Sequence, residues 1–261
     1  MNQPSDNNWG VPASDNTPIG ESSAPTPPPQ RVRVEVPQSA PYVTYAIIAI
    51  TVLAYFVQAT PFGNQFIEAL IKSNDQIRAG EVWRLLTPAL LHANLIHIGF
   101  NMYALLVFGT GLERDFGHGR FLLLYVLGAF AGNVMSFLMT NADSLGASTA
   151  IFALVGAEGM FIINNRKLFA GRFRSAIGNI IFIVVVNLVV IGSLANVDNW
   201  GHIGGLVSGL MFGWFASPIF QVEGISPILH LVDRRPMREI ITGAALVLLV
   251  FGALALWGMV R

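Results

Sequence analysis

Residues 145–152 read LGASTAIF, and this stretch marks the point where a polar loop gives way to a long apolar segment. It places two hydroxyl side chains, Ser148 and Thr149, side by side at the start of a predicted helix over 147–164. Neighbouring helical residues point about 100° apart, so only one of the two hydroxyls can face a given partner. The pair therefore either supplies a nucleophile or provides small side chains for helix packing.

The composition of the chain is typical of a membrane protein. Of its 261 residues 53% are hydrophobic and 11% are charged, whereas a soluble domain carries about 25% charged residues. Fifteen basic and fifteen acidic residues cancel, so no excess charge indicates a nucleic-acid partner. The sequence has no cysteine, which excludes disulfides, thiolate metal sites and a cysteine nucleophile. We predict an all-α polytopic membrane protein whose surroundings are the lipid bilayer.

Apolar segments divide the chain into predicted regions. Residues 39–217 hold six helices that form a membrane core, 218–238 form a cytoplasmic linker, and 239–261 form an additional C-terminal transmembrane helix. Residues 1–38 are rich in Pro, Ser, Asn and Asp and are predicted to be a disordered cytoplasmic tail. The PTPPP run in this tail suits either a polyproline ligand or a solvated tether. The seven helices are predicted over about 42–60, 94–113, 121–140, 147–164, 176–194, 200–217 and 239–260.

The distribution of Lys and Arg predicts the orientation in the membrane. With a cytoplasmic N-terminus, eleven of these residues fall on the cytoplasmic side and four on the outside, as the positive-inside rule requires. The expected location is the cell membrane. The connection over 61–93 is then external, and its apolar FIEALI and WRLLTPALL segments predict a structure that lies on the membrane surface.

Three helices that enter the membrane from outside carry polar residues at a similar depth. Ser148, His202 and His97 each lie 16 residues before the inner end of their helix, which is about 24 Å at 1.5 Å per residue. Asn101 follows His97 by one helical turn and shares its face, whereas His92 is predicted to lie about 140° away. Polar groups within a span are costly and indicate a functional site. The alternative is a hydrogen-bond network that only holds the bundle together.

The residue types at this depth suit acyl transfer. A neutral histidine such as His202 can take the proton of the Ser148 hydroxyl. No carboxylate is predicted nearby, which favours a Ser–His dyad over a triad. Backbone N–H groups at the start of the helix, with the His97 and Asn101 side chains, are candidates for stabilising an oxyanion. The sequence has no HExxH motif and no carboxylate pair that supports a metal or aspartyl mechanism, so neither a metal nor a cofactor is expected.

Small and aromatic residues support this assignment. Gly146 leaves room beside an oxyanion, and Phe152 lies one turn after Ser148 on the same helix face. Gly205 belongs to a GxxxG spacing that lets two helices approach closely, although ordinary packing is the alternative. A primary hydroxyl is also less hindered than a β-branched one. We therefore favour Ser148 as the nucleophile and expect Thr149 to be a wall or cap residue.

Five motifs in this order resemble the rhomboid family of intramembrane serine proteases. The resemblance implies Ser148 as nucleophile, His202 as base, and an oxyanion hole formed by His97, Asn101 and the Ser148 amide. It implies that Phe152 packs against the catalytic histidine, and that a seventh span is added to a six-helix core. It also implies cleavage of transmembrane protein substrates near the outer membrane face, without a cofactor. The motifs are WR at 83–84, HANLIHIGFN at 92–101, GLERDFGHGR at 111–120, GASTA at 146–150 and GHIGGLVSG at 201–209.

Other interpretations remain open at this point. Thr149 stands where the family most often has glycine, and a catalytically inactive rhomboid-like protein that binds membrane clients is the main alternative. Such proteins typically lack the serine or the histidine, and this sequence has both. A small-molecule transporter would carry charged residues deep in its spans or paired broken helices, and neither is evident. Trp83 and Arg84 suit either an interface anchor or a functional role, and Glu113 is expected to pin a helix end.

Overall fold

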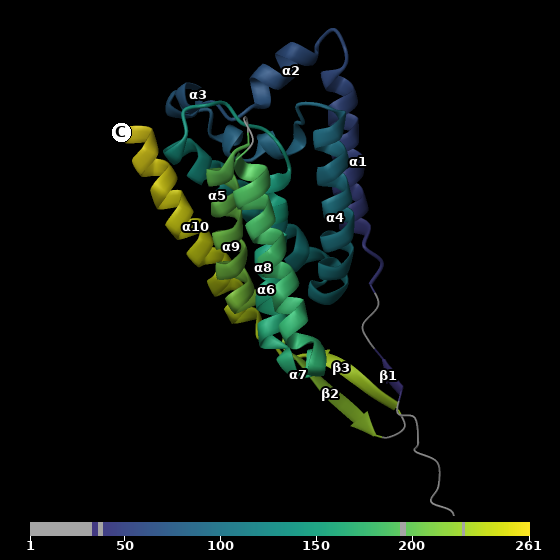
Figure 1. The fold of residues 1–261 in the computed structure, drawn as a ribbon. Helices are drawn as coiled ribbons and strands as arrows, with labels where there is room; N and C mark the ends of the chain where they lie inside the picture. Colours follow the sequence, from purple (N-terminus) through teal and green to yellow (C-terminus); the bar gives the residue numbers. More distant parts are fainter. Residues whose placement is uncertain (1–32, 36–38, 194–196, 226–227) are drawn as a thin grey trace, which may run out of the picture.

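The computed structural model describes residues 33–35, 39–193, 197–225 and 228–261. Long helices run side by side between two differently built ends (Figure 1). One end consists of the connections over 59–94 and 140–147, and we call it the loop end. The other end carries three short strands and α7 (Arg166–Phe169), and we call it the sheet end.

The helices follow the apolar segments of the sequence to within a few residues, because a long apolar run that contains no proline can satisfy its backbone polar groups only within a helix when lipid surrounds it. The fifth of them, α8, continues through a π-helical segment at Val186–Val190 and a short 3-10 turn at Ile191–Ser193. The long helices are α1 (Tyr42–Gln58), α4 (Leu95–Phe116), α5 (His118–Met139), α6 (Ser148–Asn164), α8 (Phe173–Val185), α9 (Asn199–Ala216) and α10 (Met237–Val260).

Four helical segments in the described part of the chain are long and apolar enough to cross a membrane. α1 and α6 are also apolar but shorter. The chain is therefore an integral membrane protein of mostly helical structure, while the arrangement of six spans plus a seventh stays a prediction. The four segments are Leu95–Phe116, His118–Met139, Arg166–Ser193 and Met237–Val260.

Helices α5, α6 and α9 form the centre of the bundle, and glycines let their backbones touch. A Cβ atom added at Gly205 would lie 2.0 Å from the Thr149 carbonyl oxygen, and one added at Gly209 would lie 2.1 Å from the Ala153 carbonyl oxygen. Neither distance leaves room for a side chain. The GxxxG spacing on α9 is therefore the contact surface between α9 and α6.

The loop end is tied together by polar side chains. Its elements are α2 (Gly63–Leu70), α3 (Asn74–Arg78) and the 3-10 turns Val82–Leu85 and Thr87–Leu90. Arg84 is buried and donates to the carbonyl oxygens of Glu68 and Ile71, at 2.5 and 2.8 Å. Trp83 Nε1 donates to the Ala69 carbonyl at 3.1 Å. Both residues satisfy free carbonyls at the end of α2, which is a role in holding this loop together.

At the sheet end, the linker predicted over 218–238 contains two strands that the sequence analysis did not anticipate. They are β2 (Phe220–Ile225) and β3 (Ile228–Asp233), which pair antiparallel. A third strand, β1 (Arg33–Glu35), pairs in parallel with β3. The prediction of disorder was wrong for these three residues, because a strand this short leaves no alternating pattern to read. The rest of the predicted tail lies outside the described residues.

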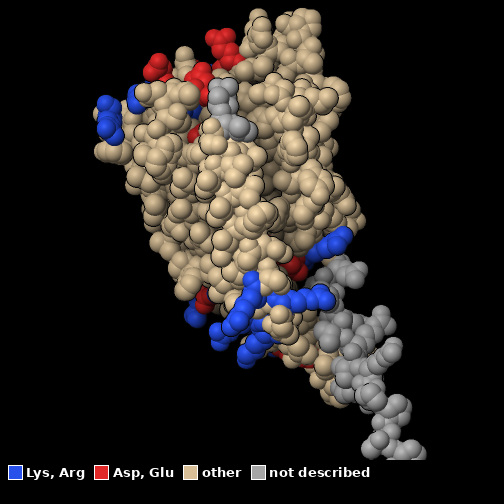
Figure 2. All heavy atoms as spheres, in the orientation of Figure 1, with Lys and Arg blue, Asp and Glu red and all other residues tan. Residues whose placement is uncertain are grey.

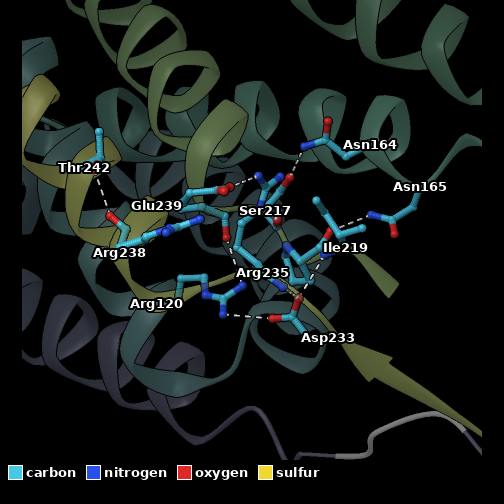
Figure 3. A network of polar contacts seen from close by, with 12 residues as sticks. Arg120, Asn164, Asn165, Ser217, Ile219, Asp233, Arg235, Arg238, Glu239 and Thr242 are labelled. Atoms are coloured by element: carbon cyan, nitrogen blue, oxygen red, sulfur yellow. Dashed lines mark hydrogen bonds and ion pairs between the residues drawn. The ribbon is translucent and has the colours of Figure 1, made fainter. Parts of the chain in front are cut away.

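A polar network fixes the strands to the helices (Figure 3). Arg120 of α5 donates to the Ala216 carbonyl oxygen and to Asp233, both at 2.9 Å. Arg235 donates to the Ser217 carbonyl oxygen at 2.8 Å and to Glu239 at 2.6 Å. These cations lie at the C-terminal end of α9, where unpaired carbonyls favour positive charge. The network therefore joins α5, α9, β3 and α10.

Glu113, near the end of α4, caps the start of α1. Its carboxylate accepts hydrogen bonds from the Val43 and Thr44 amides, at 2.8 and 2.7 Å, and from the Thr44 hydroxyl at 2.6 Å. His118 Nδ1 lies 2.6 Å from the same carboxylate. Because Pro41 precedes α1 and makes no side-chain cap, Glu113 supplies the missing acceptor from another helix.

Candidate active site

Ser148 and His202 meet near the loop end of the bundle. Ser148 is the first residue of α6, and His202 lies in the first turn of α9. The Ser148 Oγ atom lies 2.9 Å from His202 Nε2, within hydrogen-bonding distance. His202 is buried. The two side chains that the sequence analysis assigned to a dyad are thus brought together from residues 54 positions apart.

Two features hold the His202 side chain in place. Asp198 accepts from the Gly201 amide at 2.9 Å and so caps the start of α9. The Phe152 ring stacks on the His202 ring, with centroids 4.3 Å apart and planes at 11°. Among the described residues, His202 Nδ1 makes no hydrogen bond. The imidazole is therefore oriented by stacking and by its helix, and no carboxylate in the described part of the chain is hydrogen-bonded to it.

Gly146 separates His97 from Ser148. Its φ of 135° lies in the region that favours glycine. A Cβ atom at this position would lie 2.9 Å from both Cε1 and Nε2 of His97 and 3.6 Å from Ser148 Oγ. The missing side chain therefore leaves a small space bordered by the imidazole of His97 and the hydroxyl of Ser148.

Asn101 lies one turn after His97 on α4, and it is buried. Its Nδ2 atom donates to the His97 carbonyl oxygen at 2.9 Å. An asparagine amide carries two N–H groups, so this contact uses one and leaves the other. The bond fixes the side chain on the face of α4 that also carries His97.

His92 is a neighbour of the site that the sequence analysis placed on another face. That prediction was wrong because α4 begins at Leu95, after Asn94 caps it by accepting from the His97 amide at 2.9 Å. The His92 ring contacts the His97 ring edge-on, with centroids 5.0 Å apart. The signal that would have corrected the prediction is Asn94, a preferred N-cap residue that ends the helical geometry before His92 is reached.

The His92 ring also contacts the loop that leads into α6. Its Nε2 atom accepts from the Ala147 amide at 3.5 Å, a long hydrogen bond to the residue just before Ser148. Burial, with the neighbouring His97 adding to it, lowers the pKa of His92 to about 4. The ring is therefore neutral at neutral pH, which its acceptor role requires.

Thr149 forms a wall between helices. Its side chain is buried. A Cβ atom added at Gly132 of α5 would lie 2.5 Å from the Thr149 Cβ atom, and one added at Gly201 of α9 would lie 3.0 Å from the Thr149 Cγ2 atom. Within the described residues its hydroxyl makes no hydrogen bond. Of the two roles expected for Thr149, the structure therefore supports the wall and not the cap.

Comparison with known proteins identifies the family of this chain. Residues 79–219 match the Rhomboid domain family, which is more than half of the 261 residues. The chain belongs to the rhomboid family. The resemblance of its motifs is thereby confirmed, and the matched range includes every residue of the site described above.

Relatives of this rhomboid protein include bacterial and plant members. It is 42% identical over 173 residues to "Rhomboid protease GluP" of Bacillus subtilis (strain 168), covering 65% of this chain and 34% of that protein. It is 34% identical over 151 residues to "RHOMBOID-like protein 9, chloroplastic" of Arabidopsis thaliana, covering 58% and 35%. The matched regions thus span about a third of the length of these relatives.

Proposed function

We propose that this protein is an intramembrane serine protease that uses Ser148 as nucleophile and His202 as general base. The observation that carries the proposal is the 2.9 Å contact between Ser148 Oγ and His202 Nε2 inside an apolar helix bundle. A polar pair in such surroundings is costly, and function is the usual reason for its presence. The bacterial relative is named a rhomboid protease, which supports the same activity.

The proposed reaction proceeds by acyl transfer. As the Ser148 Oγ atom attacks the carbonyl carbon of the scissile peptide, its proton moves to His202 Nε2. His202 then gives this proton to the leaving amine, and the C–N bond breaks. Water gives a proton to His202 as it attacks the carbonyl carbon of the acyl ester, the C–O bond to Ser148 breaks, and His202 returns the proton to Ser148 Oγ as the acid product leaves.

The negative charge on the carbonyl oxygen needs donors that are already in position. The Ser148 amide is the first helical N–H of α6 and has no partner within its own helix. The space left by Gly146, bordered by the His97 ring, is the place we assign to the oxyanion. The free N–H of Asn101 completes the proposed set of donors.

We propose further that the substrates are transmembrane proteins cleaved near the outer membrane face. This requires that the loop end faces the outside of the cell membrane and that the N-terminus is cytoplasmic. Nine Lys and Arg residues with described side chains lie at or next to the sheet end: Arg114, Arg120, Arg166, Lys167, Arg172, Arg174, Arg234, Arg235 and Arg238. Four lie at the opposite end of the bundle, namely Lys72, Arg78, Arg84 and, directly after α10, Arg261. This imbalance supports the sheet end as the cytoplasmic side.

The proposal is tested with purified protein in vesicles and a reporter that contains one transmembrane segment. Ser148→Ala and His202→Ala should each abolish cleavage, and Ser148→Ala should also abolish labelling by a fluorophosphonate. Thr149→Val is the matched control, because it keeps the shape of a residue whose hydroxyl is unpaired, and it should keep both signals.

Cleavage by Ser148→Ala at the rate of the unchanged protein would refute the mechanism. A protein that binds the reporter but cleaves it at no detectable rate, with or without Ser148, would instead be the inactive client-binding protein considered above.

A further inference from the structure

The segment between α6 and α8 carries four positive charges at the sheet end. It consists of α7, the 3-10 turn Ala170–Arg172 and the start of α8. Its cations are Arg166, Lys167, Arg172 and Arg174, and all four are exposed. We call residues 166–174 the basic segment. Figure 2 shows Lys and Arg side chains gathered at this end of the molecule.

These charges are not compensated within the described part of the protein. The charged side chains of the four form no ion pair and no hydrogen bond with a described residue, and the one side-chain hydrogen bond to their backbone is from Ser175 to the Arg172 carbonyl oxygen. By contrast, Arg120, Arg234 and Arg235 at the same end pair with Asp233, Glu223 and Glu239. The sequence between Glu158 and Asp198 contains no acidic residue at all. The basic segment therefore presents a net charge of four to whatever surrounds it.

The helix that follows the basic segment is held weakly by the rest of the protein. No residue of α8 is buried, in contrast to α6, in which most residues are. Ile181, Phe182 and Val185 expose about half or more of their surface, which suits contact with lipid chains. Contacts within the protein therefore fix the base of α8 less firmly than that of any helix in the bundle centre.

We propose that anionic phospholipids of the leaflet at the sheet end bind the basic segment through their phosphate groups and so anchor the base of α8. The segment lies at the end of a long apolar helix, which places it at the level of the lipid headgroups. Clustered Lys and Arg next to a transmembrane helix bind anionic lipid, and arginine in particular pairs with phosphate through two N–H groups. Leu168 is exposed between the cations and adds an apolar contact.

Fluorescence quenching in vesicles tests this proposal directly. The chain has no cysteine, so Gly171→Cys provides one labelling site within the basic segment, and a side chain there meets no atom within 4 Å. The fluorophore is quenched either by spin-labelled phosphatidylglycerol or by spin-labelled phosphatidylcholine, at equal lipid fractions. We expect stronger quenching by phosphatidylglycerol, and a preference that falls as salt is added.

Variants identify the residues responsible. Arg166→Gln/Lys167→Gln should lower the preference for phosphatidylglycerol, by roughly fivefold for each charge removed at the surface. Arg114→Gln/Arg238→Gln removes the same number of exposed charges from the same end, outside the basic segment, and should leave the preference unchanged. The four residues replaced in these two double variants are all exposed, so the substitutions should not affect folding. Unchanged quenching by spin-labelled phosphatidylcholine checks this.

If both lipids quench the fluorophore equally in the Gly171→Cys protein that keeps all four cations, the proposal is overturned. An equal loss of preference in both double variants would also overturn it, because the effect would then belong to the total charge of this end. None of these measurements depends on protease activity.

Discussion

Ser148 and Thr149 are adjacent, yet the structure gives them opposite surroundings. The Ser148 hydroxyl contacts His202, whereas the Thr149 side chain packs toward Gly132 and Gly201. This follows from the angle of about 100° between neighbouring helical residues. The glycine usual in the family at position 149 is therefore replaced by a residue that fills space between α5 and α9, away from the Ser148 hydroxyl.

Gly146 tests the proposed oxyanion position at the scale of one residue. In Gly146→Ala the new Cβ would lie 2.9 Å from His97 and the backbone would be strained at a φ of 135°. We expect kcat to fall on the order of 100-fold, the effect of losing one oxyanion donor, with KM nearly unchanged. Steady-state kinetics measures this, with Gly119→Ala, where a side chain meets no atom within 4 Å, as the control. An increase in KM with unchanged kcat would show that Gly146 acts in substrate docking and not at the reaction centre.

At the scale of elements, the contact between Ser148 and His202, which we propose as a dyad, depends on how closely α9 approaches α6. Gly205 lies in α9 less than one turn after His202, and its backbone touches the Thr149 carbonyl, one residue after Ser148. The contact that brings the helices together is thus next to both catalytic candidates. The contact between Gly205 and the Thr149 carbonyl therefore affects both the stability of the bundle and the geometry of the site.

Gly205→Ala should therefore reduce both stability and cleavage. The added Cβ would lie 2.0 Å from a backbone oxygen, so α6 and α9 must separate, and overpacking of this kind costs about 1–3 kcal/mol. Gly111→Ala in α4 is the control, because a side chain there meets no atom within 4 Å and alanine favours the helix by about 1 kcal/mol. Unfolding in mixed micelles and reporter cleavage are the measurements. Unchanged cleavage in Gly205→Ala would show that the dyad tolerates helix separation.

Lys72 links the loop-end elements to the segment that precedes α6. It is fully buried, donates to the Thr140 and Ala142 carbonyl oxygens at 3.1 and 2.8 Å, and pairs through its backbone with Ser144. Burial lowers the pKa of Lys72 from 10.5 to about 8, against the attraction of Asp198. The charged ammonium is therefore retained at neutral pH at a cost in stability.

The depressed pKa of Lys72 makes stability depend on pH. The folded protein releases this proton near pH 8, whereas the unfolded chain keeps it up to about pH 10.5. Between these values the unfolded state binds more protons, so the free energy of unfolding should rise with pH. Lys72→Met should remove this rise and Lys167→Met, at the only other lysine, should keep it. Unfolding in detergent from pH 7 to pH 11 provides the measurement, and an identical slope in both variants would contradict the assignment.

At the scale of the whole molecule, the two ends are built for different surroundings. The loop end closes over the start of α6 and α9 with short helices and buried polar contacts, whereas the sheet end joins strands to helix termini through arginine (Figures 1 and 3). The excess of Lys and Arg at the sheet end predicts that it faces the cytoplasm.

Cysteine labelling tests this orientation. Ala142→Cys lies at the loop end and Ile225→Cys at the end of β2, both positions are exposed, and no native cysteine interferes. A maleimide that cannot cross membranes should label Ala142→Cys in intact cells and Ile225→Cys only after the membrane is permeabilised. Labelling of both from the same side would refute the proposed topology and, with it, cleavage near the outer face.

The sequence by itself determined the membrane class, the helical segments and the family, because apolar runs and helix starts are local properties that each stretch carries alone. It also indicated Ser148, His202, His97 and Asn101, since depth along a helix follows from counting residues. Contacts between distant segments were decided only by the tertiary structure. The pairing of β1 with β3, the ring contact of His92 and the wall formed by Thr149 depend on how helices rotate and how closely their backbones approach. No pattern within one segment encodes these quantities, because each is set by the shapes of two surfaces at once.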